Sequence, residues 1–336
     1  MYRKRVYFIA FVILSLGFSS CNRVQESSRG NESNTTTKLQ TLEVSDTIDA
    51  IFEPELEAND ESEEEKDIVE KSENVGIDDG SYPSNTIEEI DYSDCFDNIE
   101  GCAVFLNSQT HEYKIYNIER SNQFSSPCST FKIISTLMGL ETGVISSADS
   151  KMGYDGTMYS TASWNKDMGL KEAFRESCIW YFRKVINHIG PKEVQSYLDQ
   201  LKYGNRDIRE WYGSKVNNSP ALNGFWLESS LQISPKEQVD VLANIFEESS
   251  EFAPQNIKLL KEVMLVESNN DTYVYGKTGS GRNPETGKND NGWFVGMYER
   301  TDEVYYFAVH LTDNQKEVSG QKAKEIALNI LEKYYE

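Results

Sequence analysis

Apolar residues recur with a regular period only from about residue 91 onward. Two short runs, 101–108 and 112–117, alternate apolar and polar positions and predict a β-hairpin. Three further runs of this kind, 272–280, 292–299 and 303–312, predict strands near the C-terminus. The predicted strands therefore lie at the two ends of the periodic part of the chain.

Between these strands the apolar period lengthens to that of an amphipathic helix. The run 129–143 is apolar at helical spacing and reaches Gly143, a residue type common at helix C-termini. The run 169–190 predicts a longer helix or a helix pair that ends at Gly190. Both segments are rich enough in apolar residues to be largely buried.

Two more helices follow. Ser234, Pro235 and Glu237 form the sequence of a capping box that opens a helix, and the run 319–335 predicts a closing helix. Strands at both ends with helices between them predict an α/β fold with α+β layers: a central antiparallel sheet flanked by helices, with an additional helical region.

The formal net charge of −22 belongs to one segment of the chain. Residues 41–100 hold 22 aspartates and glutamates against Lys66 and Lys71, which leaves the other residues close to neutral. Residues 22–90 are also poor in aromatics, so we expect a disordered acidic linker there. This charge argues against a nucleic-acid partner.

The N-terminus has the pattern of an export signal. Arg3, Lys4 and Arg5 precede an apolar run at 6–18 that is short for a membrane span, and Cys21 follows small residues. This end resembles a bacterial lipobox, which implies a lipidated Cys21 after a signal peptide at 1–21. The alternatives are an ordinary cleaved signal and a single anchor helix. We expect an exported lipoprotein at the periplasmic face of a membrane or the cell surface, with a catalytic domain at 91–336.

Four other cysteines lie in the predicted domain, and an exported chain meets oxidising conditions. Cys95 and Cys102 are close enough in sequence for a disulfide around a short loop, which we predict. Cys128 and Cys178 are either free thiols or a bridge. The histidines are scattered and there is no paired-cysteine motif, so we expect no metal site.

Four short motifs occur in order after the acidic segment. They are Ser129-Thr130-Phe131-Lys132 at a helix start, Ser177-Cys178-Ile179 in a helical region, Tyr203-Gly204-Asn205 at a turn and Lys277-Thr278-Gly279 at the end of a strand. With "FWLESSLQISPKEQ" between the last two, the ordered set resembles the class D serine β-lactamases. It is also similar to the penicillin-sensing domains of bacterial receptors. The resemblance covers residues 92–336 and implies the serine β-lactamase/transpeptidase-like fold.

The residues themselves support nucleophilic catalysis. A serine hydroxyl needs a base to become a nucleophile, and one helical turn places Lys132 on the same face as Ser129. A charged lysine cannot act as a base, but burial lowers the pKa of an amine. A neutral amine can take up carbon dioxide, so the reaction needs no cofactor beyond carbon dioxide or bicarbonate.

The resemblance assigns the remaining roles. It implies that Lys132 is carbamylated and acts as the general base, that Trp226 donates a hydrogen bond to it, and that Ser177 relays a proton to the leaving nitrogen. It also implies that Lys277 is catalytic, supplying positive potential for the substrate carboxylate and helping the proton relay, and that Thr278 hydrogen-bonds that carboxylate. The same resemblance gives Gly279 and Ile179 places in the β-lactam binding site, with the backbone N–H groups of Ser129 and Ser280 holding the oxyanion.

The family's carboxylate-binding arginine at the start of the last helix has no counterpart here, because that segment reads "SGQKAKEIA". Lys322, Lys324 and Ala323 all remain open for this position. We expect a β-lactam hydrolase. The alternatives are a penicillin sensor that stays acylated and a cell-wall transpeptidase or peptidase. The sequence does not choose the preferred β-lactam or the oligomeric state.

Overall fold

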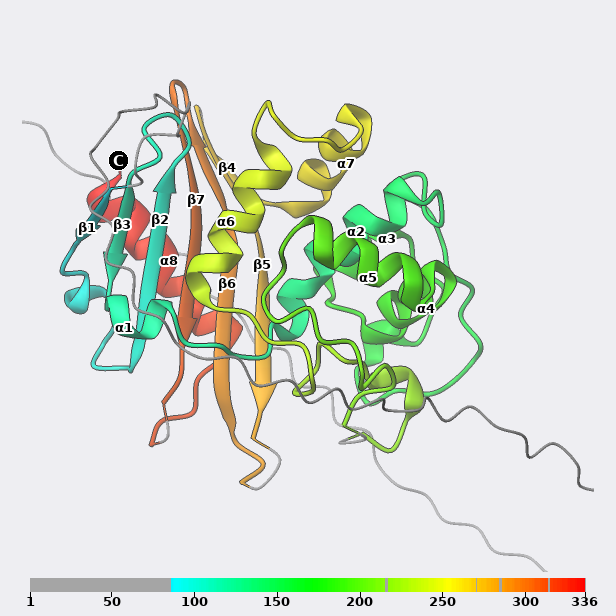
Figure 1. Cartoon of the computed structure of the whole chain (residues 1–336). Helices are drawn as coiled ribbons and strands as arrows, with labels where there is room; N and C mark the ends of the chain where they lie inside the picture. Colours follow the sequence, from blue (N-terminus) through cyan, green and yellow to red (C-terminus); the bar gives the residue numbers. More distant parts are fainter. Residues whose placement is uncertain (1–85, 215–216, 270, 284–285, 314, 336) are drawn as a thin grey trace, which may run out of the picture. The chain divides into compact units, whose positions relative to one another are not determined.

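The structure is a computed structural model that describes residues 86–335 except 215–216, 270, 284–285 and 314. These residues fall in one compact unit, Val75–Glu336. Seven strands form one sheet in the order β1-β3-β2-β7-β6-β5-β4 (Figure 1). Their bounds are β1 (Ile87–Glu89), β2 (Gly101–Asn107), β3 (Tyr113–Tyr116), β4 (Leu265–Asn269), β5 (Thr272–Arg282), β6 (Asn289–Arg300) and β7 (Glu303–Leu311).

All strand pairs are antiparallel except β1 with β3, which are parallel. The predicted hairpin is confirmed, because β2 pairs with β3 from Ala103↔Tyr116 to Leu106↔Tyr113. The antiparallel sheet flanked by helices is confirmed as well. Strand β1 lies a few residues before position 91, where we expected the catalytic domain to begin.

The helices fill the segments between and after the strands. The α-helices are α1 (Ile118–Ser121), α2 (Lys132–Glu141), α3 (Leu170–Arg175), α4 (Ile179–Ile189), α5 (Pro191–Gln200), α6 (Pro235–Phe246), α7 (Pro254–Met264) and α8 (Gly320–Tyr334). The 3-10 helices are η1 (Ser93–Cys95), η2 (Cys128–Phe131), η3 (Ala162–Trp164) and η4 (Pro220–Leu222). The predicted capping box is present at α6, where Ser234 and Glu237 cap each other's backbone N–H groups. Within the described residues, no helix has the length and apolarity to cross a membrane.

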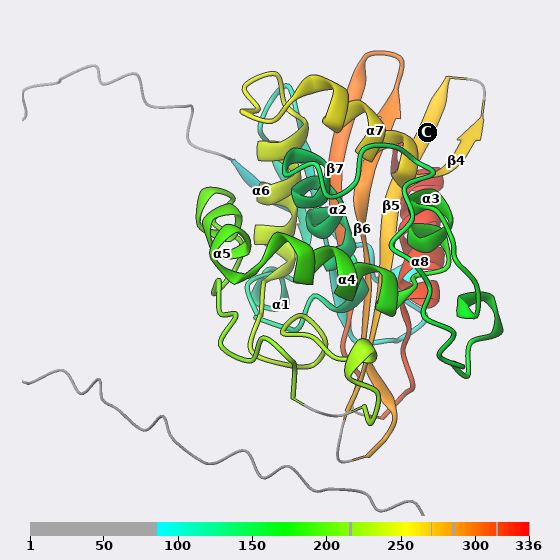
Figure 2. The same ribbon diagram turned by 90° about the vertical axis from the view of Figure 1, so that its right-hand side faces the viewer.

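The sheet separates two hydrophobic layers. On one face α8 packs against β5, β6 and β7, and Ala103 and Phe105 of β2 point toward it. On the other face α6 crosses β7 and β2, and the helical region α2 to α5 adjoins it (Figures 1 and 2). Val104 and Leu106 point into this second layer, because successive side chains of a strand alternate between its faces.

This alternation explains why the predicted Cys95–Cys102 disulfide is wrong. All four cysteines of the described part of the chain are free and buried. Cys95 lies in η1 and packs into the α8 layer, whereas Cys102 has the parity of Val104, which points to the opposite face. The sheet therefore stands between the two sulfurs. Cys128 and Cys178 also remain as thiols.

Strand β5 has a free edge where the predicted site lies. Strand β4 pairs with β5 only from Thr272 to Tyr275. Beyond Tyr275, the described chain pairs β5 with β6 alone, and η2 packs beside the unpaired edge. The fold thus brings the turn with Ser129 next to the strand with Lys277.

Candidate active site

Ser129 lies in η2, a short turn whose backbone is fixed on both sides. The Thr130 N–H and hydroxyl both donate to Pro127 O, at 3.1 and 2.7 Å. Gln238 of α6 donates to the Thr130 hydroxyl at 2.9 Å. Cys128 has a φ of 51°, a conformation that costs a non-glycine residue energy and is common at functional sites. The predicted nucleophile therefore lies on a rigid, strained turn.

Lys132 is the first residue of α2, and its amine faces the serine as predicted. Its Nζ lies 2.7 Å from Ser129 Oγ. The lysine is fully buried, and its Nζ lies 5.6 Å from the centre of the Phe182 ring. Burial lowers the pKa of Lys132 to about 7, because the charged form loses its hydration. A large fraction of the amine is then neutral near pH 7, as a base requires.

Ser177 lies in the turn between α3 and α4, not within a helix. Its φ is 54°, and its N–H donates to Phe174 O at 3.1 Å. Ile179, the first residue of α4, is half-buried. Residues close to Ser177 in sequence interact with both lysines. Burial lowers the pKa of Lys132, and the Cys178 thiol opposes this shift. The Phe174 ring lies 5.7 Å from Lys277 Nζ. The strained turn is a stronger signal of function than a helical serine bonded to a carbonyl.

Lys277 is buried in β5 beside the first lysine. Its Nζ lies 3.0 Å from Thr278 O and 3.4 Å from Thr278 Oγ1. Burial, and then the positive charge of Lys132, hold the pKa of Lys277 well below its usual value. Two neighbouring ammonium groups disfavour each other. An anion bound here therefore favours the charged form of Lys277.

Trp226 has a donor without an acceptor. Its indole is 1% exposed and stacks on Phe131, the residue before Lys132, with ring centroids 5.6 Å apart. Its Nε1 is fully buried and has no hydrogen-bond partner within the described residues. Buried donors are nearly always paired. An acceptor brought within reach of Nε1 would satisfy this donor.

Gly279 and Ser280 lie where β5 meets η2 and α8. A Cβ at Gly279 would lie 3.1 Å from Pro127 O and from the Thr130 methyl group, so a side chain here would push η2 away by a few tenths of an ångström. Ser280 Oγ accepts from the N–H of Gly320 at 2.9 Å. A Cβ at Gly320 would likewise meet Gly279 O at 2.5 Å. Turn, strand and last helix are therefore packed closely around the site.

The three positions considered for carboxylate binding differ in surroundings. Ala323 is fully buried in the α8 layer. Lys322 Nζ is 2.9 Å from Asp97, in an ion pair outside the predicted site residues. Lys324 lines a hollow of about 380 Å³ together with Lys277 and Thr278, and its Nζ is 3.6 Å from Glu267. Of the three, only Lys324 shares a surface with the predicted site.

A buried polar network behind the nucleophile was not predicted. Cys128 Sγ donates to Glu228 Oε1 at 2.9 Å, and Asn291 Nδ2 donates to Ser126 O at 3.1 Å. His310 Nε2 donates to Asn291 Oδ1 at 2.9 Å, since an amide oxygen can only accept. Burial lowers the pKa of His310 to about 3, so the ring is neutral. The only sequence signal was that Glu228 lies two residues after Trp226. Asn291 and His310 come together through the pairing of β6 and β7, which short motifs do not show.

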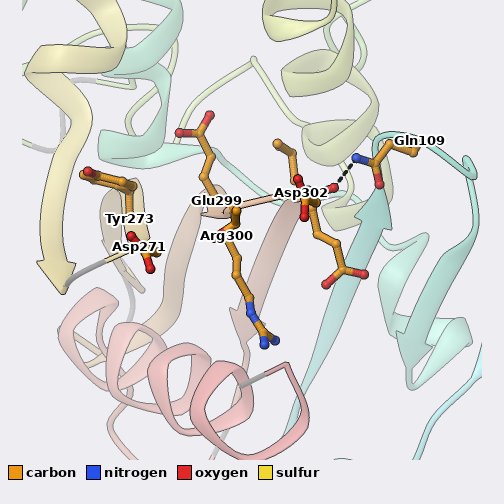
Figure 3. A pocket seen from close by; sticks show the side chains of 9 residues that line it. Gln109, Asp271, Tyr273, Glu299, Arg300 and Asp302 are labelled. Carbon is orange, nitrogen blue, oxygen red and sulfur yellow. Dashed lines mark hydrogen bonds between the residues drawn. The ribbon is translucent and has the colours of Figure 1, made fainter.

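A second hollow lies at the other end of β5, at the turn between β6 and β7 (Figure 3). It encloses about 760 Å³, more than the hollow beside Lys277. Its walls include Asp271, Glu299 and Asp302, and Gln109 donates to the backbone carbonyl of Asp302 (Figure 3). This hollow holds no nucleophile–base pair, so its size does not make it the reactive site.

A serine on a helical turn, a buried lysine one turn later and a lysine on the adjacent strand edge form the arrangement that serine acyl transfer requires. The penicillin binding protein transpeptidase domain model matches residues 101–332. The Bacillus licheniformis regulatory protein BlaR1 is 38% identical over 253 residues, which are 75% of this chain and 40% of the relative. The probable β-lactamase YbxI of Bacillus subtilis is 34% identical over 248 residues, covering 74% of this chain and 86% of the relative.

A solved class D β-lactamase from Bacillus subtilis aligns with a TM-score of 0.64 and 33% identity, over 73% of this chain and 96% of that one. The chain therefore belongs to the penicillin-binding transpeptidase family, among relatives that include class D β-lactamases and the penicillin sensor BlaR1. It spans less than half the length of the BlaR1 proteins it matches. The predicted resemblance and the fold it implied are confirmed.

Proposed function

We propose that this chain is a class D serine β-lactamase that hydrolyses β-lactam antibiotics through an acyl-enzyme on Ser129. The observation that carries this proposal is the fully buried Lys132 amine, 2.7 Å from Ser129 Oγ, in the residue after Phe131, whose ring stacks on Trp226. The close likeness to the probable β-lactamase YbxI supports the same reaction.

The residues around Lys132 fit a carbamate on its amine. Nitrogen–carbon bond formation with carbon dioxide turns a neutral amine into an anionic carbamate and releases one proton. The lowered pKa of Lys132 provides the neutral amine, and Trp226 Nε1 provides a buried donor for a carbamate oxygen. Such a group supplies a general base close to the hydroxyl of Ser129.

The remaining residues act on the substrate. Ser129 Oγ attacks the lactam carbonyl, and the backbone N–H groups of Ser129 and Ser280 stabilise the oxyanion. Removing one such donor typically costs ~10²–10³ in rate. Ser177 passes a proton to the lactam nitrogen as its bond to carbon breaks. Lys277 and Thr278 hold the substrate carboxylate, which in turn favours the charged form of Lys277.

One observation favours a second function. The chain is more similar to BlaR1 of Bacillus licheniformis, at 38% identity, than to YbxI, at 34%. A penicillin sensor uses the same serine but keeps the acyl group. The two functions differ in deacylation alone, so turnover distinguishes them.

Our predictions for residues 1–85 concern a segment outside the described part of the chain. We propose that Cys21 carries a lipid, that residues 1–21 are the signal peptide, and that the acidic segment after Cys21 tethers the domain to a membrane or cell surface. Mass spectrometry of the mature protein from bacterial membranes tests this. An intact Met1, or cleavage elsewhere without lipid, contradicts it.

The experiment for the main proposal is turnover of a chromogenic cephalosporin by the purified protein. The protein is first stripped of carbon dioxide at low pH and then assayed with and without bicarbonate. A β-lactamase with this mechanism turns over many equivalents, and bicarbonate restores its rate. A single equivalent of product, with acylated Ser129 found by peptide mapping even in bicarbonate, establishes the sensor instead. Ser129→Ala controls for background hydrolysis.

A further inference from the structure

Arg183, in the middle of α4, is a buried cation that pairs with no carboxylate of the described residues. It is 3% exposed, and its Nη1 donates to the backbone carbonyl of Trp211 at 2.5 Å. Its Nη2 is fully buried and meets no acceptor in the part of the chain that the structure describes. Burial lowers the pKa of Arg183 to about 10, so the guanidinium remains charged at neutral pH.

Aromatic rings take the place of a counter-ion. The guanidinium carbon lies 5.1 Å from the ring centre of Trp211, 5.3 Å from that of Tyr212 and 5.7 Å from that of Trp226. These separations are within the range of cation–π attraction. The charge is therefore held against π faces, one of which belongs to the proposed active site.

The indole of Trp226 connects this cation to the base. It contacts the guanidinium and also stacks on Phe131, the residue before Lys132. Phe182, which precedes Arg183 in α4, lies over the Lys132 amine. Helix α4 thus contributes an apolar ring to the lysine and a positive charge to the tryptophan.

Resting on the proposed function, we infer that Arg183 is a positioning residue that holds the Trp226 indole and favours the carbamate on Lys132. The effect of Arg183 passes through the indole. The cation lies against the Trp226 ring, fixes its orientation and favours an anion that accepts from Nε1. Little water is present to screen this effect, since Arg183 and Trp226 are both buried.

If Arg183 were purely structural, its hydrogen bond would only connect α4 to the backbone of Trp211. The two roles differ in their effect on the affinity of Lys132 for carbon dioxide. A structural hydrogen bond contributes to folding stability and leaves this affinity unchanged. A charge behind Trp226 changes that affinity in a protein that is still folded.

The test measures the carbamate directly. Wild type, Arg183→Gln, Arg183→Lys and the control Lys184→Gln are titrated with ¹³C-labelled bicarbonate, and the carbamate carbon is followed by NMR. Lys184 is the matched control, because it is the next cation of α4 and lies 5.6 Å from the ring of Trp180. Circular dichroism and thermal unfolding establish that each variant is folded.

We expect Arg183→Gln to need several-fold, up to about tenfold, more bicarbonate for half-maximal signal, as for a charge acting across a buried ring. Arg183→Lys should recover part of this loss, and Lys184→Gln should match wild type. If Arg183→Gln does not fold, Tyr212→Ala replaces it, because Tyr212 is 71% exposed and its loss lets water screen the guanidinium. That variant should raise the bicarbonate requirement as well.

The outcomes separate the two proposals. A carbamate signal in wild type that Arg183→Gln and Tyr212→Ala leave unchanged overturns the role of Arg183 and leaves the hydrolase proposal intact. If wild type gives no carbamate signal, Lys132 is not carbamylated and Arg183 cannot have this role. If Lys184→Gln needs as much extra bicarbonate as Arg183→Gln, the effect comes from the overall charge of α4 and not from the position of Arg183. That result also overturns the inference.

Discussion

The amine of Lys132 lies 2.7 Å from the hydroxyl of Ser129 and is fully buried behind it. A lysine inside an apolar layer destabilises the fold while it is charged, and the same burial makes it a base near neutral pH. The two consequences have one cause. They are therefore measurable on the same variant.

Replacing Lys132 with methionine should abolish turnover and stabilise the protein at low pH. The pKa of Lys132 is lowered to about 7 from about 10.5, so the unfolded chain binds more protons than the folded chain between these values. Wild-type stability therefore rises with pH through this window. The gain of Lys132→Met should be a few kcal/mol below pH 7 and vanish toward pH 10.5.

Urea unfolding at several pH values without bicarbonate measures this gain. Ile133→Met, a change to another buried residue of α2, is the matched control and should show no such pH dependence. A gain that is constant from pH 6 to pH 10 would mean that Lys132 titrates normally in the folded protein.

Replacing Trp226 with phenylalanine should separate packing from hydrogen bonding. The ring contacts with Phe131 are kept, whereas the Nε1 donor is removed. A carbamate without this donor in a dry pocket loses about 1–3 kcal/mol. We expect slower deacylation, little change in acylation, and partial recovery in high bicarbonate, all measured by stopped-flow with a chromogenic substrate. Equal slowing of both steps would contradict the role of the indole.

Much of the fold followed from the sequence because its signals are local. The capping box of α6 and the hairpin of β2 and β3 each depend on residues close in sequence, and both are present as predicted. The Ser129–Lys132 pair is local as well, since one turn of chain separates the two residues. Residues 203–205 also form the predicted turn.

The disulfide prediction failed because sequence separation does not show on which face of the sheet a side chain lies. Cys95 and Cys102 are close along the chain. Cys95 packs into the α8 layer, whereas alternation along β2 places Cys102 on the opposite face. Arg183 and the Glu228 network were missed for a related reason. Their partners come from distant segments, which the chain brings together only when it packs.

Lys324 should hold the carboxylate of the substrate. It shares a hollow with Lys277 and Thr278, whereas Lys322 pairs with Asp97 on another surface. Lys324→Ala should raise KM roughly two- to fivefold with little change in kcat, the size expected for a partly exposed ion pair. Lys322→Ala is the matched control. A cephalosporin ester that lacks the carboxylate should be insensitive to Lys324→Ala, and an equal effect on ester and acid would exclude this contact.

Glu228 connects the strained turn of Ser129 to the segment of Trp226. Its Oε1 accepts from Cys128 Sγ, and its own backbone N–H donates to Ser126 Oγ at 2.9 Å. Burial raises the pKa of Glu228, so the folded protein holds this proton to a higher pH than the unfolded chain does. The stabilisation is thus complete below the ordinary pKa of a glutamate and is lost as pH rises through the raised value.

Glu228→Gln keeps the acceptor oxygen and cannot ionise, so it should be more stable relative to wild type at pH 7 than at pH 4. Thermal unfolding at both values measures the difference, with the exposed Glu248→Gln as control. Because wild-type Glu228 becomes charged beside the turn as pH rises, the same variant should also flatten the pH dependence of the acylation rate. A variant whose stability tracks wild type at both pH values would show that Glu228 has the same pKa in the folded and unfolded protein, which would contradict the effect of its burial.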